Sequence, residues 1–348
     1  MRLTQREKRM ARGEEGPGVA RCMEILIKFA EAFDAPEMVE ISSAHIMPLE
    51  PPELLLGLTE GITQMAVFTT VHPWMSACDP SSWQQMGVPE AFARRELPAC
   101  ETRVDVYRRL GVCQTYTCLP MLVGNLPRQD QVVSWVGSGA QLIANSLLGA
   151  RCNRDAVVAL ASAVTGRTPL RGLLLDENRR ARVAVRFEDR EPGRLSDVEL
   201  SAAGYYLGAR AGGRNIAIEG LPKNMPLESL KSLIAPLAVT GAVGVCHMVG
   251  VTPEAPTREA ALGNRKPEED IVVTGRDIRE SLDRFAGDGE KVDMVVLGCP
   301  HCTIPDVKRI AAATCRSQRL PSTHWGCASS WHLPSWISKI PSRRWWTW

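Results

Sequence analysis

The chain has 348 residues, of which 45% are hydrophobic and 23% are charged, and its 41 basic side chains nearly balance 39 acidic ones. A chain of this length can bury a large core and form two or three lobes. The charge balance leaves no basic excess for a nucleic-acid backbone or an anionic membrane, and no apolar run reaches the roughly 18 residues of a spanning helix. Residues 1–16 also lack a signal-peptide core. We therefore expect a soluble, cytoplasmic protein that binds neither nucleic acid nor membrane.

Helix and strand signals alternate along the chain. Residues 17–35 carry apolar side chains at helical spacing, and a strand is expected after them at 38–42. A helix followed by a strand is predicted again at 55–65 and 66–71, at 91–110 and 111–117, and at 227–239 and 242–248. A strand at 292–297 and a helix at 305–313 complete the series. Strands separated by helices predict parallel sheets covered on both faces, the α/β class, with chemistry at the carboxyl ends of strands.

The domain organisation is expected to be one catalytic unit over residues 1–313. Soft internal boundaries are predicted at the glycine-rich segment 208–213 and at the polar segment 253–269. Residues 314–348 differ in composition, because they hold six of the nine Trp and no Asp or Glu. No helical or strand period runs through them, so we expect a divergent, disordered tail, with an aromatic anchor for a partner or membrane as the alternative.

The cysteines number eleven, an odd count that favours reduced thiols over a disulfide framework. Most are expected to be buried as small apolar side chains. Cys118 and Cys299 differ, since each directly follows a predicted strand. Residues 303–306 carry a helix-capping pattern, and the start of a helix favours a thiolate. Cys299 and Cys302 are therefore plausible metal ligands, while their Cys-x-x-Cys spacing leaves a thiol redox protein open.

Eight short segments carry a more specific signal through their order along the chain. They are Ser42-Ser43-Ala44-His45, Thr69-Thr70, Thr117-Cys118-Leu119-Pro120, and the segments 144–151, 165–169, 176–179, 250–255 and 298–301. Each is weak alone, but together they resemble the ordered motifs of the aconitase X family, in its large catalytic subunit, over roughly residues 1–313.

The resemblance implies an aconitase-like, multi-lobed α/β fold with a central cleft, and a dehydratase reaction at an iron–sulfur centre. A 4Fe-4S cluster is expected, with 2Fe-2S or mononuclear iron as alternatives. Of the family's three cysteine ligands, the first two match Cys118 and Cys299. The third is not recognisable, because the family pattern is lost beyond about residue 313, which indicates truncation or alteration there. His301 is a candidate to tune the cluster, or else a histidine bonded to a backbone carbonyl.

Iron–sulfur chemistry explains why three thiolates suit this reaction. An iron with an open coordination position can bind a departing hydroxyl, which three protein ligands leave possible and four do not. Polar residues near predicted strand ends are then candidates for catalysis, namely Ser43, His45, Thr69, Thr70, His247 and Glu254. At position 72 the chain has His where the family suggests Asn.

Five further residues are candidates to bind substrate. They are Asn145, Ser146, Arg151, Arg167 and Arg179. Arginine forms bidentate contacts with carboxylates and phosphates, so we expect one or two of the three to hold the anionic groups of the substrate. A structural ion pair with Asp176 or Glu177 is the competing interpretation for any one of them. The amide and hydroxyl at 145 and 146 either bond substrate or cap a turn.

The resemblance also implies a partner, since the family's proton-abstracting serine lies in a separate swivel domain that no segment here resembles. We therefore expect a small subunit that supplies the catalytic base. The expected substrate is mevalonate 5-phosphate, because phosphomevalonate-type members pair separate subunits, with cis-3-hydroxy-L-proline as the alternative. A non-catalytic, partner-binding relative is the hypothesis from another class.

Overall fold

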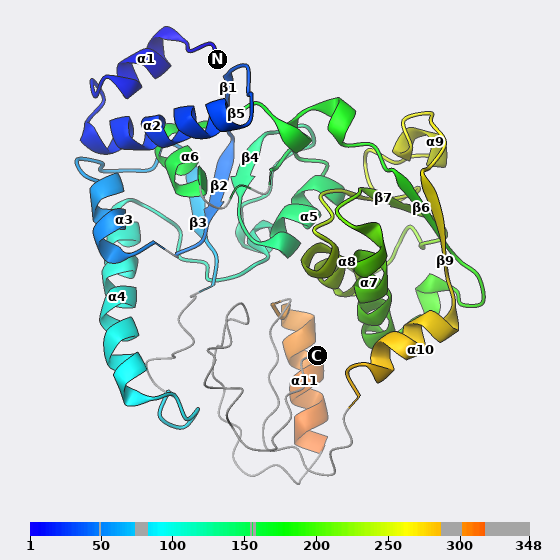
Figure 1. The fold of residues 1–348 in the computed structure, drawn as a ribbon. Helices are drawn as coiled ribbons and strands as arrows, with labels where there is room; N and C mark the ends of the chain where they lie inside the picture. The colour runs from blue at the N-terminus through cyan, green and yellow to red at the C-terminus, as the bar shows by residue number, and fades with distance from the viewer. Residues whose placement is uncertain (49, 74–82, 154, 156–157, 287–300, 317–348) are drawn as a thin grey trace.

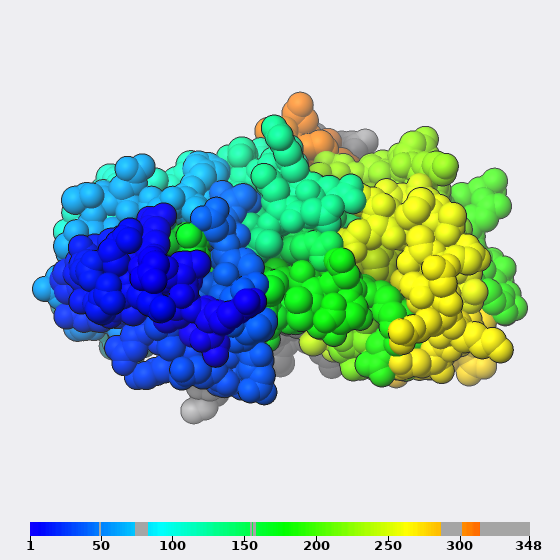
Figure 2. Space-filling model, turned by 90° about the horizontal axis from the view of Figure 1, so that it is seen from above, coloured from blue at the N-terminus to red at the C-terminus, as the bar shows by residue number. Residues whose placement is uncertain are grey.

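The computed structural model describes residues 1–48, 50–73, 83–153, 155, 158–286 and 301–316, and these form two lobes (Figure 1). Seen from above, the N-terminal residues fill one end of the molecule and the residues around 250–283 the other (Figure 2). Within the described residues no helix is long and apolar enough to cross a membrane.

The first lobe is built on a three-stranded parallel sheet of order β3-β2-β4. Its strands are β2 (Ser43–Ile46), β3 (Phe68–Val71) and β4 (Val133–Trp135). A separate antiparallel pair joins β1 (Met38–Glu40) to β5 (Arg167–Pro169). The helices of this lobe are α1 (Gln5–Ala11), α2 (Pro17–Ala32), α3 (Pro52–Leu58), α4 (Glu90–Arg109) and α6 (Ala159–Thr165). Their apolar faces bury one common core with β2 and β3.

The second lobe has a four-stranded parallel sheet of order β8-β7-β6-β9. The strands are β6 (Val183–Phe187), β7 (Ile216–Ile218), β8 (Cys246–Met248) and β9 (Glu269–Val273). The helices are α7 (Asp197–Ala211), α8 (Leu227–Gly241), α9 (Arg258–Ala261) and α10 (Gly275–Asp283). Short 3-10 turns lie at Pro120–Val123, Gly172–Leu174, Asp176–Asn178 and Pro192–Arg194.

Helix α5 connects the lobes, and helix α11 lies against the second lobe. Helix α5 (Ser138–Ser146) follows β4 of the first sheet and packs on α8 of the second lobe. Helix α11 (Ile304–Arg316) lies beneath α5 and α8 in Figure 1, and its Arg309 pairs with Asp197 at the start of α7 at 2.8 Å. Residues from both halves of the chain therefore meet around α5 and the start of α11.

The predicted α/β class is confirmed, and several predicted elements have different bounds. The strand expected at 38–42 ends at Glu40 as β1, and a separate strand, β2, starts at Ser43. The chain changes partners between them: the Ile41 N–H bonds the Gly166 carbonyl, whereas the Ser42 N–H bonds the Val132 carbonyl. The strand expected at 111–117 is wrong, since Gly111 and Tyr116 have positive φ and only an isolated bridge at Cys113 forms.

Three further elements have bounds that differ from those predicted. Helix α3 ends at Leu58, because Thr59 leaves helical geometry and Gly61 has positive φ. Strand β8 starts only at Cys246. The helix expected at 305–313 is confirmed as α11, which extends into the predicted tail as far as Arg316. The strand expected at 292–297 and residues 317–348 lie outside the described residues.

The glycine-rich segment 208–213 begins inside α7, where glycine permits close contact with α8. A Cβ on Gly204 would lie 2.2 Å from the Leu233 carbonyl oxygen, and one on Gly208 would lie 3.0 Å from the backbone nitrogen of Gly241. The boundaries predicted at 208–213 and 253–269 stay predictions.

We expect Gly204→Ala to lower the free energy of unfolding by about 1–3 kcal/mol, because the added methyl group meets a backbone carbonyl that cannot rotate away. Urea unfolding followed by circular dichroism measures the change. Gly57→Ala in α3 is the matched control, since nothing lies within 4 Å of its Cβ position, and it should raise stability by up to about 1 kcal/mol. Equal effects of the two substitutions would contradict the close helix contact.

Candidate functional site

Cys118 and His301 are in direct contact although 183 residues separate them. The backbone N–H of His301 donates to Cys118 Sγ at 3.2 Å, and His301 Nδ1 lies 3.0 Å from the same sulfur. Cys118 is half-buried and precedes the 3-10 turn at Pro120–Val123. A sulfur that accepts a backbone N–H and lies beside a histidine ring nitrogen is in a suitable environment for a thiolate.

His301 is positioned by the first turn of α11. The Thr303 N–H donates to Asp306 at 2.8 Å, and the Asp306 N–H donates to the Thr303 hydroxyl at 3.2 Å, so the predicted capping pattern is present. Burial opposes charge on Asp306, but hydrogen bonds from Lys231, Thr303 and Arg309 hold the pKa of its carboxyl well below the ordinary value. Burial, and then the charge of Lys231, lowers the pKa of His301 to about 4. The His301 ring is therefore neutral at pH 7.

A buried polar cluster lies on β2 and β3. His45 Nδ1 is 2.8 Å from the Thr70 hydroxyl, and His45 Nε2 is 3.1 Å from His72 Nδ1. The Asn125 amide donates to Thr70 and to the Ala44 carbonyl, at 2.9 Å each. Burial, and then the charge of His72, lowers the pKa of His45 well below its ordinary value. Burial, and then the charge of His301, lowers the pKa of His72 to about 3. Both rings are thus neutral hydrogen-bonding groups close to His301.

Acid is expected to destabilise the protein through His72. Its folded pKa of about 3 lies below the ordinary 6.5, so the unfolded chain binds the proton first. The stability that the neutral ring contributes is present above pH 6.5 and is lost as the pH falls toward 3. Between pH 7 and pH 5 the wild type should lose about 2 kcal/mol more than His72→Asn, measured by urea unfolding at both values. Parallel losses in the two proteins would contradict this.

The hydroxyl groups of Ser43 and Thr69 form hydrogen bonds with neighbouring protein groups. The Trp135 indole N–H donates to the Ser43 hydroxyl at 3.2 Å, and the Thr69 hydroxyl donates to the Val67 carbonyl at 2.9 Å. Both residues lie within strands, as do His45 and Thr70, because β2 begins at Ser43 where the sequence suggested that a strand had ended. The expected placement is therefore wrong for Ser43, which begins a strand. His45 and Thr70 lie one residue before the ends of β2 and β3, and they are in contact.

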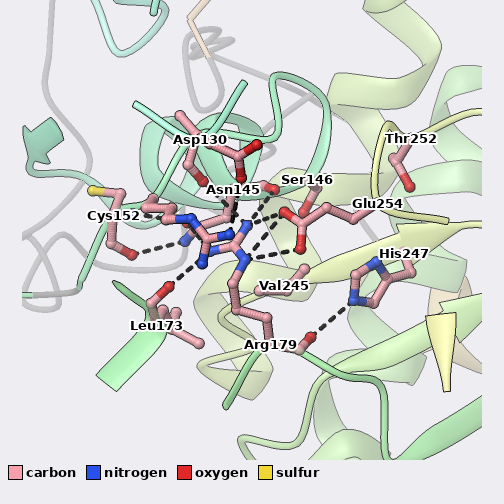
Figure 3. Close-up of polar contacts among 12 residues, drawn as sticks. Asp130, Asn145, Ser146, Cys152, Leu173, Arg179, Val245, His247, Thr252 and Glu254 are labelled. Atoms are coloured by element: carbon pink, nitrogen blue, oxygen red, sulfur yellow. Dashed lines mark hydrogen bonds and ion pairs between the residues drawn. The ribbon is translucent and has the colours of Figure 1, made fainter. Parts of the chain in front are cut away.

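A second buried cluster surrounds Arg179 (Figure 3). Its Nε donates to Glu254 at 2.9 Å, and its Nη1 donates to the Asn145 side chain at 3.1 Å and to the Leu173 carbonyl at 2.8 Å. Nη2 donates to the carbonyls of Asn145 and Ala150, at 3.1 Å each. Only 3% of the Arg179 side chain is exposed. The guanidinium therefore joins α5 to the second lobe, as a buried structural contact.

The remaining candidates near Arg179 are held by the backbone. His247 Nε2 lies 2.8 Å from the Arg179 carbonyl, and burial lowers the pKa of its ring. The Ser146 hydroxyl accepts from the Cys246 N–H at 2.9 Å. Asn145 and Ser146 are the last residues of α5, and His247 lies within β8, so only Glu254 follows a strand end as expected.

The other two arginines also face carboxylates. Arg151 pairs with Asp176 at 2.5 Å and with Asp130 at 2.9 Å, and both acidic partners are largely exposed. Arg167 pairs with the buried Glu7 of α1 at 3.0 Å, away from the Arg179 cluster. The Arg151–Asp176 contact is the structural ion pair that the sequence offered as the competing interpretation. Each of the three arginines thus forms an ion pair with a protein carboxylate.

Thus the described residues bring Cys118, His301, His45 and Thr70 into one neighbourhood and place Arg179, Asn145 and Glu254 in another. Cys299 lies outside the described residues, and within the described part no three His, Cys, Asp or Glu side chains form a group that could hold a metal ion. Asn125 and Lys231 are not among the residues predicted from the sequence. Lys231 had a readable signal, because it occupies the apolar face of its helix, four residues after Leu227.

Known proteins share the fold of this chain. Residues 1–177 match the family model of the aconitase X first domain, and residues 181–283 match that of the aconitase X second domain. The chain therefore belongs to the aconitase X family.

Particular relatives cover most of the chain. It is 36% identical to the phosphomevalonate dehydratase large subunit of Methanothermobacter thermautotrophicus, over 94% of this chain and 80% of that one. It is 31% identical to the cis-3-hydroxy-L-proline dehydratase of Pseudomonas aeruginosa, over 91% of this chain and 55% of that one. The crystal structure of Thermococcus kodakaraensis aconitase X in its holo-form matches with a TM-score of 0.76 and 30% identity, over 90% of this chain and 77% of that one.

Proposed function

We propose that this protein is the large, catalytic subunit of an iron–sulfur hydro-lyase that removes water from mevalonate 5-phosphate. The observation that carries the proposal is the contact between Cys118 and His301. Cys118 matches the family's first cysteine ligand, and His301 follows Cys299, which matches the second, by two residues. Relatives with both dehydratase names support the reaction class. The chain is 36% identical to a phosphomevalonate dehydratase large subunit and 31% identical to a hydroxyproline enzyme, which favours the first substrate.

The residues present fit an iron–sulfur centre at Cys118. The sulfur is half-buried and receives the His301 N–H, and His301 Nδ1 can donate as well once the thiol is deprotonated. Such donors stabilise negative charge on cysteine sulfur and tune the centre. Cys118 and Cys299 would hold the group, which we propose to be a 4Fe-4S cluster. When bound, it supplies a Lewis acid for the departing hydroxyl.

The chain's own polar residues then bind and orient the substrate. Neutral His45 and His72, with Thr70 and Asn125, form a buried hydrogen-bonded network that supports the site without adding charge beside the thiolate. For the anionic groups we propose Arg151, because its partners Asp130 and Asp176 are exposed and can give way to a substrate anion. Arg179 is already saturated by its contacts. The base that takes the proton is supplied by a small subunit, as the name "large subunit" of the relatives suggests.

Anaerobic reconstitution with iron and sulfide tests the proposal. The chain, combined with a small subunit of the phosphomevalonate dehydratase type, should turn brown and should dehydrate mevalonate 5-phosphate faster than cis-3-hydroxy-L-proline. The reverse preference would assign the other substrate. A colourless, folded chain that still binds the small subunit would favour the non-catalytic alternative.

The thiol redox alternative predicts a reversible disulfide between Cys299 and Cys302. Burial raises the pKa of the Cys302 thiol, which disfavours the thiolate that such exchange needs. Mass spectrometry after mild oxidation tests this, and a reversible Cys299–Cys302 disulfide in the iron-free protein would support the redox alternative.

A further inference from the structure

Lys231 is a buried lysine that the proposed chemistry does not use. It lies in α8 and is only 4% exposed, and lysine is almost never buried this fully unless its charge is paired. Its Nζ donates to the backbone carbonyl of His301 at 2.9 Å and to the carboxylate of Asp306. Both acceptors belong to one short segment, residues 301–306.

Hydrogen bonds within the same segment meet at the carboxylate of Asp306. Its Oδ2 atom accepts from Lys231 and also from the Thr303 N–H and hydroxyl, at 2.8 and 2.9 Å. The ammonium group of Lys231 therefore fixes the segment at both ends, at the carbonyl of residue 301 and at the carboxylate of residue 306. Because Lys231 belongs to a helix of the second lobe, it ties the start of α11 to that lobe.

His301 links Lys231 to Cys118. Lys231 binds the carbonyl of His301, while the N–H of His301 points at Cys118 Sγ at 3.2 Å and its Nδ1 lies 3.0 Å from that sulfur. Because Lys231 holds the carbonyl of His301, His301 has less freedom to move its backbone N–H and its ring away from the sulfur. Loss of the Lys231 contact would free the backbone N–H and the ring of His301 together.

We propose that Lys231 is a positioning residue that holds His301 so that its N–H and its Nδ1 face the sulfur of Cys118. This inference rests on the proposed function in one respect, that Cys118 is an iron ligand. Hydrogen-bonding partners of metal ligands orient them and set metal affinity and reduction potential, and their loss typically costs 10–100-fold in affinity. Lys231 acts one residue further out and exerts its effect through His301.

The test compares Lys231→Met with the matched control Lys308→Met, an exposed lysine on α11 itself. In iron-loaded protein, Lys231→Met should lose iron to a chelator about ten times faster than wild type, with a more negative reduction potential. In iron-free protein, hydrogen exchange of the peptide that starts at His301 should be faster in Lys231→Met. Lys308→Met should match wild type in all three measurements.

The outcomes separate this inference from the proposed function. Iron release, potential and exchange equal to wild type in Lys231→Met would overturn the positioning role, as would a loss of thermal stability with an unchanged potential. If wild type binds no iron, the proposed function fails, and hydrogen exchange alone decides the inference: unchanged exchange overturns it. If Lys231→Met does not fold, Asp306→Asn removes the charge from the other side of the contact and should change release and potential in the same direction.

Discussion

Replacing Cys118 with Ala is expected to remove bound iron and to reduce dehydratase activity by about 1,000-fold. Lewis-acid stabilisation of a leaving group contributes several kcal/mol, and each 1.4 kcal/mol corresponds to about tenfold in rate. Iron content after anaerobic reconstitution, visible absorption and steady-state turnover measure the effect. The fold should persist, because Cys118 is only half-buried and Ala is smaller.

Cys113→Ala is the matched control for this substitution. Cys113 lies five residues away, and its side chain is exposed. We expect iron content and turnover within about twofold of wild type, since surface substitutions usually change stability by less than about 0.5 kcal/mol. Iron retained in Cys118→Ala, or lost in Cys113→Ala, would show that the first family cysteine has been assigned to the wrong residue.

Replacing Arg179 with Met is expected to lower the free energy of unfolding by about 3–5 kcal/mol. The substitution removes the partner of Glu254 and leaves the buried carbonyls of Leu173, Asn145 and Ala150 without their shared donor. Urea unfolding at pH 7 measures the loss. Lysine at this position should restore little, because an ammonium group cannot reproduce the planar set of donors.

Arg182→Met is the control for Arg179. Arg182 also forms an ion pair, with Glu268, but both side chains are substantially exposed, and such pairs contribute about 0–1 kcal/mol. If Arg179→Met kept wild-type stability and instead raised the KM for substrate, Arg179 would be a substrate ligand, as the sequence analysis first suggested. The two measurements thus decide between the interpretations that the sequence left open.

Local patterns in the sequence predicted the elements that depend on local chemistry. The capping pattern at Thr303 and Asp306 could be read directly, because cap and partner are three residues apart. The break between β1 and β2 could not, since it depends on which distant strand accepts the next N–H: Gly166 accepts at Ile41 and Val132 accepts at Ser42. Propensity carries no information about such long-range partners.

The candidate site shows the same limit. The family motifs indicated His45 and Thr70, and the structure brings both into one cluster. They did not indicate Asn125, which comes from a loop and joins the cluster through the Thr70 hydroxyl. The arginines were singled out by their suitability for anions, yet this property serves a protein carboxylate as well as a substrate, so only the contacts distinguish the two uses.

The span of 183 residues between Cys118 and His301 has a consequence for biosynthesis. A nascent chain that has emerged from the ribosome only as far as residue 283 contains both regions that match the family models, but not the donors that face this sulfur. Contacts of such long range form late and leave the groups concerned accessible in the meantime. The cluster proposed at Cys118 would therefore meet the backbone N–H of His301 only after residue 301 has left the ribosome.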